Sequence, residues 1–102
     1  MAAGARGGIV VTATLLPTAW KRIYDLACEG KTQDALALHR SLIPLMNLAF
    51  AETNPGPMKS VMDLIDVHAP DMLAPLVQAD PALSANLRAE LEKQLDLFER
   101  KL

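Results

Sequence analysis

The stretch Gly7-Gly8-Ile9-Val10-Val11-Thr12-Ala13-Thr14 decides the fold of this chain. Its β-branched residues follow a glycine pair and precede the turn Leu15-Leu16-Pro17. This order predicts a β-strand over about residues 8–13 and then a helix. Successive side chains of a strand point to opposite faces, and here both faces are mostly apolar. Such a pattern is typical of a parallel strand that is covered on both sides.

No other segment of the chain has comparable strand character. A strand must pair its backbone N–H and C=O groups with neighbouring strands, because unpaired groups are costly once they are buried. We therefore expect residues 8–13 to be the last strand of a sheet whose other strands lie upstream, outside these 102 residues. In this interpretation the sequence is the C-terminal part of a larger α/β enzyme.

The remainder of the chain is predicted to be helical. Pro17 suits the first turn of a helix that ends at Glu29-Gly30. Thr32 can cap a second helix that runs to about residue 50. A short third helix is expected over about residues 57–65, and Asp80-Pro81 should cap and begin a last helix that runs almost to the end.

Apolar residues at helical spacing predict which faces of these helices are buried. The first helix has one stripe, the second has two apolar faces and should be sandwiched between other elements, and the last has a leucine at every fourth position. Two charged pairs at i,i+4 spacing, Arg88 with Glu92 and Asp96 with Arg100, should add a little stability to the last helix. The stripe of the first helix is Trp20, Ile23, Tyr24 and Ala27. The second helix has Ala35, Leu38, Leu42, Leu45, Met46 and Ala49 on one face, and Leu36, Ile43 and Phe50 on the other. The stripe of the last helix is Leu83, Leu87, Leu91, Leu95 and Phe98.

Composition excludes several classes of function. The net charge is −2 and the ten Lys and Arg residues are scattered, so no nucleic-acid-binding surface is indicated. No apolar run approaches the roughly 20 residues that span a bilayer. A single cysteine, Cys28, rules out an intrachain disulfide framework and suits a reducing compartment, so we expect a cytoplasmic protein with a buried, inert thiol at this position.

Two motifs in this order resemble a known family. Gly8-Ile9-Val10-Val11-Thr12-Ala13-Thr14, followed by a proline-led helix, is similar to the Gly-Val-Ile-Ser-Val-Thr-Ala-Asn segment of the dihydrodipicolinate synthase / N-acetylneuraminate lyase family. Asn54-Pro55-Gly56-Pro57-Met58-Lys59 resembles the Asn-Pro-x-Pro-x-Lys motif of that family, and Leu73-Ala74-Pro75-Leu76-Val77 resembles its Leu-Pro-Leu segment. The resemblance covers nearly all of this chain and only the C-terminal third or so of the family's length.

The resemblance implies an α/β parent, a (β/α)8 TIM barrel that carries a C-terminal three-helix extension. Residues 1–30 would be the last β/α unit of the barrel, and residues 31–102 would be the extension. It also implies Schiff-base chemistry between a lysine and pyruvate or another 2-oxo acid, with no further cofactor, in a homotetramer. In lysine biosynthesis the second substrate of such an enzyme is aspartate semialdehyde.

The catalytic residues that the resemblance implies are not in this chain. The Schiff-base lysine and the acid/base tyrosine of the family lie upstream of the matched segment, and none of the five lysines here lies in an apolar strand that could lower its pKa. Ile9 alone carries over to the pocket, because it matches the isoleucine that borders the bound keto acid. Thr14 stands where the family usually has asparagine, and Val10 where it often has serine.

Structural roles are expected for the turn residues Asn54, Pro55, Pro57 and Lys59, since an asparagine before proline suits a rigid turn. No metal site is predicted, because the two histidines have no further ligand at a suitable spacing. Two alternatives stay open. One is an N-acetylneuraminate or sugar-acid aldolase of the same family, and the other is a stand-alone helical interaction module without catalysis.

Overall fold

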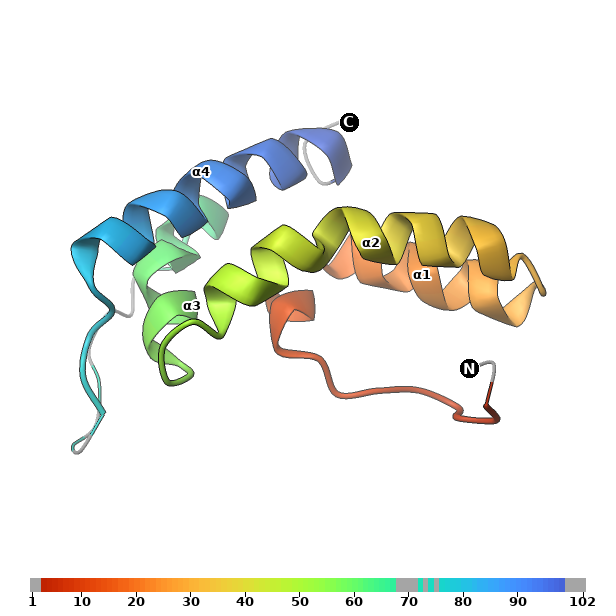
Figure 1. Cartoon of the computed structure of the whole chain (residues 1–102), viewed down its shortest axis with the longest axis horizontal. Helices are drawn as coiled ribbons and strands as arrows, with labels where there is room; N and C mark the ends of the chain where they lie inside the picture. Colours follow the sequence, from red (N-terminus) through yellow and green to blue (C-terminus); the bar gives the residue numbers. More distant parts are fainter. Residues whose placement is uncertain (1–2, 68–71, 73, 75, 99–102) are drawn as a thin grey trace.

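The computed structural model describes residues 3–67, 72, 74 and 76–98, and these residues form helices with no β-strand among them. Two are 3-10 helices, η1 (Val11–Thr14) and η2 (Met62–Ile65). The α-helices are α1 (Pro17–Cys28), α2 (Thr32–Ala49), α3 (Gly56–Val61) and α4 (Pro81–Phe98). Figure 1 shows α1 and α2 side by side as an antiparallel pair, with α4 packed against α2 and α3.

The predicted strand over residues 8–13 is wrong for this chain as it stands. Val10 has extended backbone angles, φ −126° and ψ 119°, but the next four residues coil into η1. The backbone of residues 5–9 makes no hydrogen bond to any other described residue. The physical reason is that the described residues contain no second strand to pair with this segment. The backbone N–H groups after this segment instead donate to nearby carbonyls of the same segment. The Ala13 N–H, for example, donates to the Val10 C=O at 3.2 Å.

The helix boundaries follow the sequence prediction closely, with one wrong cap. Asp80 caps α4 as expected: its Oδ2 accepts hydrogen bonds from the backbone N–H groups of Ala82 and Leu83, at 3.0 and 3.4 Å. Thr32, however, is already the first residue of α2. Lys31 occupies the capping position, where it forms no side-chain cap.

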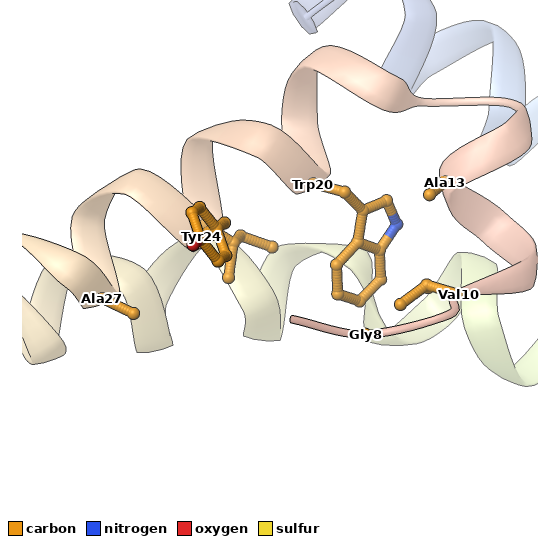
Figure 2. Close-up of a pocket in the computed structure, with 7 residues that line it drawn as sticks. Gly8, Val10, Ala13, Trp20, Tyr24 and Ala27 are labelled. Atoms are coloured by element: carbon orange, nitrogen blue, oxygen red, sulfur yellow. The ribbon is translucent and has the colours of Figure 1, made fainter. Parts of the chain in front are cut away.

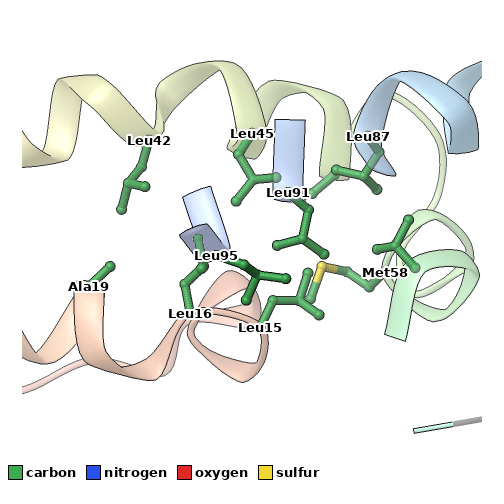
Figure 3. Packing of buried hydrophobic residues seen from close by; sticks show 11 residues of the cluster. Leu15, Leu16, Ala19, Leu42, Leu45, Met58, Leu87, Leu91 and Leu95 are labelled. Atoms are coloured by element: carbon green, nitrogen blue, oxygen red, sulfur yellow. The ribbon is translucent and has the colours of Figure 1, made fainter. Parts of the chain in front are cut away.

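One hydrophobic core joins all four α-helices. Figure 3 shows leucines of α2 and α4 meeting Leu15, Leu16 and Met58 in a single cluster. Leu15 and Leu16, which the sequence indicated only as turn residues, are among the most deeply buried side chains. They anchor the chain between η1 and α1. The buried members are Leu15, Leu16, Ala19, Leu42, Leu45, Ala49, Met58, Val61, Leu87, Leu91 and Leu95.

Helix α1 is apolar on two faces, whereas the sequence analysis predicted a single stripe. Its most deeply buried residues are Ala19 and Leu26, and neither belongs to the predicted stripe. The stripe from Trp20 to Ala27 is only partly covered, and Tyr24 within it remains 41% exposed. Cys28 is exposed rather than buried. It follows Leu26 by about 200° around the helix and so points away from the core.

The second apolar face of α2 is only partly covered by the residues that the structure describes. Ile43 and Phe50 remain 37% and 54% exposed, so the prediction that α2 is sandwiched is wrong for the described residues. The other face behaves as predicted, because its residues Ala35, Leu42, Leu45 and Ala49 are all buried. Buried residues thus lie on the faces that meet other helices of this chain.

A charged contact fixes α4 to the α3–η2 segment. Arg88 donates to both carboxylate oxygens of Asp63, at 2.8 and 2.7 Å, and to the backbone C=O of Ser60 at 3.0 Å. This hydrogen bonding to Asp63 raises the pKa of Arg88 above its usual value. Arg88 therefore pairs chiefly with Asp63, a residue 25 positions away, while the predicted partner Glu92 adds a smaller electrostatic attraction. Arg100, of the other predicted pair, lies outside the described residues.

Candidate functional site

The two segments that carry the family resemblance face one another across an open groove of about 360 Å³. Ile9 and its neighbours form one wall, and the turn that contains Asn54 and Lys59 forms the other. These segments are more than forty residues apart in the sequence. The lining residues are Ile9, Val10, Val11, Thr14, Asn54, Pro55, Met58, Lys59 and Met62.

The turn at residues 53–59 is held by its own backbone and by the core. The Gly56 N–H donates to the Thr53 C=O at 3.1 Å, and the Lys59 N–H donates to the Pro55 C=O at 2.9 Å. Pro57 and Met58 are buried. A Cβ at Gly56 would lie 3.1 Å from the Val77 C=O, so a glycine allows the two backbones to approach. The turn is thus fixed by local backbone hydrogen bonds and by close packing against the segment at residue 77.

Ile9 lies at the mouth of the groove with its side chain fully exposed, at 106% of the reference area. The apolar side chain can form one wall of a ligand pocket only if further structure closes over it. Met62, Val11 and Thr14 join the groove without having been singled out from the sequence as lining residues. The signal that could have found Met62 is its spacing of four residues from Met58, which places both on one side of the short helical segment.

Neither Lys21 nor Lys31 is placed to act as a Schiff-base nucleophile. Lys21 lies on the surface and pairs with Asp25 at 2.9 Å. The hydrogen bond with Asp25 raises the pKa of Lys21, whereas a nucleophilic amine requires a lowered pKa. Lys31 lies 3.4 Å from Glu29, also at the surface.

Metal binding and membrane insertion find no support in the part of the chain that the structure describes. No group of three or more His, Cys, Asp or Glu side chains is positioned to hold a metal ion. His39 instead meets Trp20 edge-on, with ring centroids 6.2 Å apart. Within the described ranges, none of the helices is sufficiently long and apolar to cross a bilayer.

Tyr24 gives a direct test of the local geometry of α1. The neighbouring Cys28 side chain, one helical turn later, is the main cause that raises the pKa of Tyr24 above its usual value. Because the folded pKa is raised, this contact stabilises the fold below pH 10 and is lost as the pH rises through the folded pKa. Tyr24 is the only tyrosine, so its ionisation can be followed by absorbance without interference.

We expect a titration midpoint above that of an unfolded control, and we expect Cys28→Ala to move the midpoint down towards 10.0. Cys28→Ser, which keeps a small polar side chain but carries no thiolate charge, should lose the part of the shift that comes from the charge of Cys28. An unchanged midpoint in Cys28→Ala would contradict the proposed contact.

Comparison with known proteins gives a consistent result across sequence and structure. The sequence profile of the dihydrodipicolinate synthetase family matches residues 1–94. The 4-hydroxy-tetrahydrodipicolinate synthase of Pelobacter propionicus is 37% identical over 92 residues, which are 90% of this chain and 32% of that protein. The enzyme of the same name from Methanococcus aeolicus is 33% identical over 90 residues, 88% of this chain and 31% of that protein.

Comparison with solved structures finds members of the same family. The crystal structure of dihydrodipicolinate synthase from Thermotoga maritima superposes with a TM-score of 0.84 at 30% identity, covering 90% of this chain and 31% of that one. A monomeric dihydrodipicolinate synthase variant also matches with a TM-score of 0.84 at 30% identity, covering 91% of this chain and 31% of that chain. The chain thus spans about a third of the length of the relatives it matches.

Proposed function

Because this chain belongs to the dihydrodipicolinate synthetase family, we propose that it supplies the C-terminal third of a Schiff-base lyase built on a (β/α)8 barrel. Residues 1–30 would be the last β/α unit, and residues 31–102 the helical extension. The intact enzyme would condense pyruvate with aspartate semialdehyde, as a homotetramer in the cytoplasm. Its Schiff-base lysine and its acid/base tyrosine would lie in the other two thirds.

The superposition on dihydrodipicolinate synthase structures carries this proposal. The match extends over about nine-tenths of this chain at a TM-score of 0.84. A helical module that only shared a local motif with the family would not keep its helices in the same mutual arrangement over this length. The core that joins the four helices explains why the arrangement is retained.

This chain would contribute one residue of the substrate pocket and one structural turn. Ile9 would border the bound keto acid once the strand is completed and the barrel closes over its exposed side chain. Asn54, Pro55, Pro57 and Lys59 would shape the turn that faces Ile9 across the groove. No residue of this chain would form a covalent bond with substrate.

A chimera tests the proposal. The segment of the Pelobacter propionicus enzyme that this chain matches would be replaced by the chain itself, and condensation of pyruvate with aspartate semialdehyde would be measured. We expect activity, with the borohydride-reduced pyruvate adduct on the relative's portion. Ile9→Asp should depress pyruvate turnover roughly tenfold or more, because it desolvates a charge beside the anionic keto acid, whereas Ile9→Val should be tolerated.

A chimera that folds cooperatively and condenses no substrate would contradict the proposal. The isolated 102-residue chain is expected to give no borohydride-trapped adduct with pyruvate, and an adduct on it would contradict the assignment of the nucleophile to the other two thirds. An aldolase acting on N-acetylneuraminate or another sugar acid is the second candidate. The valine at position 10 and the threonine at position 14 favour testing it, because both depart from the usual residues of the family segment they match.

The third candidate is a stand-alone helical module. The closed core of the four helices favours it, since this core needs no residue from outside the chain. Such a module would melt cooperatively and bind a partner in isolation, and the chimera would then be inactive.

A further inference from the structure

Helix α4 begins with a capping arrangement that a residue from another part of the chain completes. Asp80 accepts hydrogen bonds from the N–H groups of Ala82 and Leu83, and its own backbone N–H donates to Oε1 of Glu52 at 3.1 Å. In a capping box, the acceptor for this last N–H is a Glu or Gln side chain three residues after the cap. That position is Leu83 here, which offers no acceptor, so Glu52 supplies one from 28 positions away.

This contact ties α4 to the turn at residues 53–59. Glu52 immediately precedes the turn. Gly56 within the turn lies against the segment that leads into α4, since a Cβ there would be 3.1 Å from the Val77 C=O. The backbone hydrogen bonds inside the turn join residues three or four positions apart and fix its shape. Its place relative to α4 depends instead on contacts with distant residues.

The same side of α4 also contacts the segment that follows the turn. Ser84 and Arg88 follow Asp80 at four-residue spacing, which places the three residues on one side of the helix. Ser84 Oγ donates to Ser60 Oγ at 2.9 Å. Arg88 donates to the Ser60 C=O and to both carboxylate oxygens of Asp63. A strip of polar contacts therefore joins α4 to residues 52–63.

Residues 52–63 also form the wall of the groove that faces Ile9. The residues of this wall are Asn54, Pro55, Met58, Lys59 and Met62. None of them belongs to the three that make side-chain or carbonyl contacts with the polar strip of α4, which are Glu52, Ser60 and Asp63. None of the described residues of α4 lines the groove. Helix α4 can thus set the position of the wall without touching a ligand in the groove.

We propose that Glu52 is a positioning residue: by accepting the Asp80 N–H, it sets the place of the turn and the width of the groove between Asn54 and Ile9. This inference rests on the proposed function, in which the groove receives the substrates of a Schiff-base lyase. Pyruvate would be held there by a covalent bond to the lysine of the other two thirds. The second substrate would be held only by non-covalent contacts, so its binding would depend more strongly on the position of the wall.

An apolar hollow nearby serves as an internal reference. The N-terminal segment that forms the other wall of the groove also borders this hollow of about 370 Å³, which lies beside the predicted stripe of α1. Figure 2 shows the Trp20 indole in the hollow, between Val10 and Ala13. Residues 52–63 do not line it, so a displaced turn would alter the groove and leave the surroundings of Trp20 as they are.

Steady-state kinetics of the chimera test the proposal. Glu52→Ala should raise the KM for aspartate semialdehyde roughly fivefold or more, because the turn loses its contact with the Asp80 N–H. The KM for pyruvate and kcat should stay within about twofold, which a general loss of stability would not produce. Glu52→Gln keeps an oxygen that can accept the same N–H and should restore most of the KM. Glu29→Ala is the matched control, since Glu29 is a surface carboxylate that pairs with Lys31, and should change none of these constants.

Three kinetic results would overturn the proposal. They are unchanged kinetics in Glu52→Ala, a rise of both KM values by the same factor, and a failure of Glu52→Gln to restore the KM for aspartate semialdehyde.

The isolated chain gives a second measurement that does not depend on catalysis. The Asp80 amide should exchange with solvent roughly threefold or more faster in Glu52→Ala than in the unchanged chain, while the amides of α2 stay protected in both. The NMR signals of the Met58 and Met62 methyl groups should shift in Glu52→Ala and stay in place in Glu29→Ala. The indole N–H signal of Trp20, the only tryptophan, should not move in either variant. Equal exchange of the Asp80 amide, or unmoved methyl signals, would contradict the role of Glu52.

The outcomes separate this inference from the proposed function. If the chimera with the unchanged chain condenses no substrate, the enzymatic assignment fails, while faster Asp80 exchange and shifted methyl signals in Glu52→Ala would still support the positioning of the wall. If the chimera is active and Glu52→Ala leaves its kinetics unchanged, the enzymatic assignment stands and this inference fails.

Discussion

Leu91→Ala is expected to lower the free energy of unfolding of the isolated chain by about 3 kcal/mol. Leu91 is completely buried, and Figure 3 places it at the centre of the core, among Leu45, Leu95 and Met58. Removing its side chain loses the transfer free energy of the buried methyl groups and leaves a cavity that the helices on three sides can fill only in part. A domain of this size has only about 5–15 kcal/mol in total, so the loss is a large fraction.

Leu97→Ala is the matched control, because it is the same change on the same helix at a side chain that is 45% exposed. We expect it to cost less than about 1 kcal/mol, since little apolar area leaves water on folding there. Urea unfolding followed by circular dichroism measures both variants against the unchanged chain. Similar losses for the two leucines would mean that α4 does not pack as described.

Arg88→Ala is expected to lower the free energy of unfolding by about 2 kcal/mol. Arg88 makes a bidentate contact with Asp63 and a third hydrogen bond to the Ser60 C=O, and its side chain is 38% exposed. Partial solvent screening keeps the expected loss well below that of a buried ion pair. Most of the effect arises because the variant leaves the Asp63 carboxylate without its main partner.

Two further variants separate the charge from the geometry of this contact. Arg88→Lys keeps the charge but cannot form the planar two-pronged contact, and should recover less than half of the loss. Lys93→Ala removes a cation from the exposed side of α4 and should change stability by less than about 0.5 kcal/mol. If Arg88→Lys were as stable as the unchanged chain, the bidentate geometry would not matter. Salt titration adds a check, because the Arg88–Asp63 contribution should weaken only partly at high ionic strength.

Much of the helical layout could be read from local signals. Pro17, Asp80 and Pro81 act within one helical turn of their own position, so the ends of α1 and α4 follow from nearby residues. The fourfold spacing of Leu87, Leu91 and Leu95 places these three side chains on one face of α4, and this face could also be read from the sequence. The family resemblance was also present in the sequence, since its two motifs need only the order and spacing of residues, and comparison with known proteins confirmed it.

The tertiary structure decided whatever depends on residues far apart in the chain. Strand propensity at residues 8–13 could not make a strand, because a ladder needs a second segment and no described part of this chain provides one. The pairing of Arg88 with Asp63 and the groove between Ile9 and the turn at Asn54 likewise join positions 25 or more residues apart. Periodicity showed that α1 has apolar residues, but only the packed helices showed that Ala19 and Leu26 are buried while Trp20 and Tyr24 line the hollow. Neighbouring residues determine local hydrogen bonds and helix caps. Burial and strand pairing depend instead on segments that are distant in the sequence and pack against these residues in the fold.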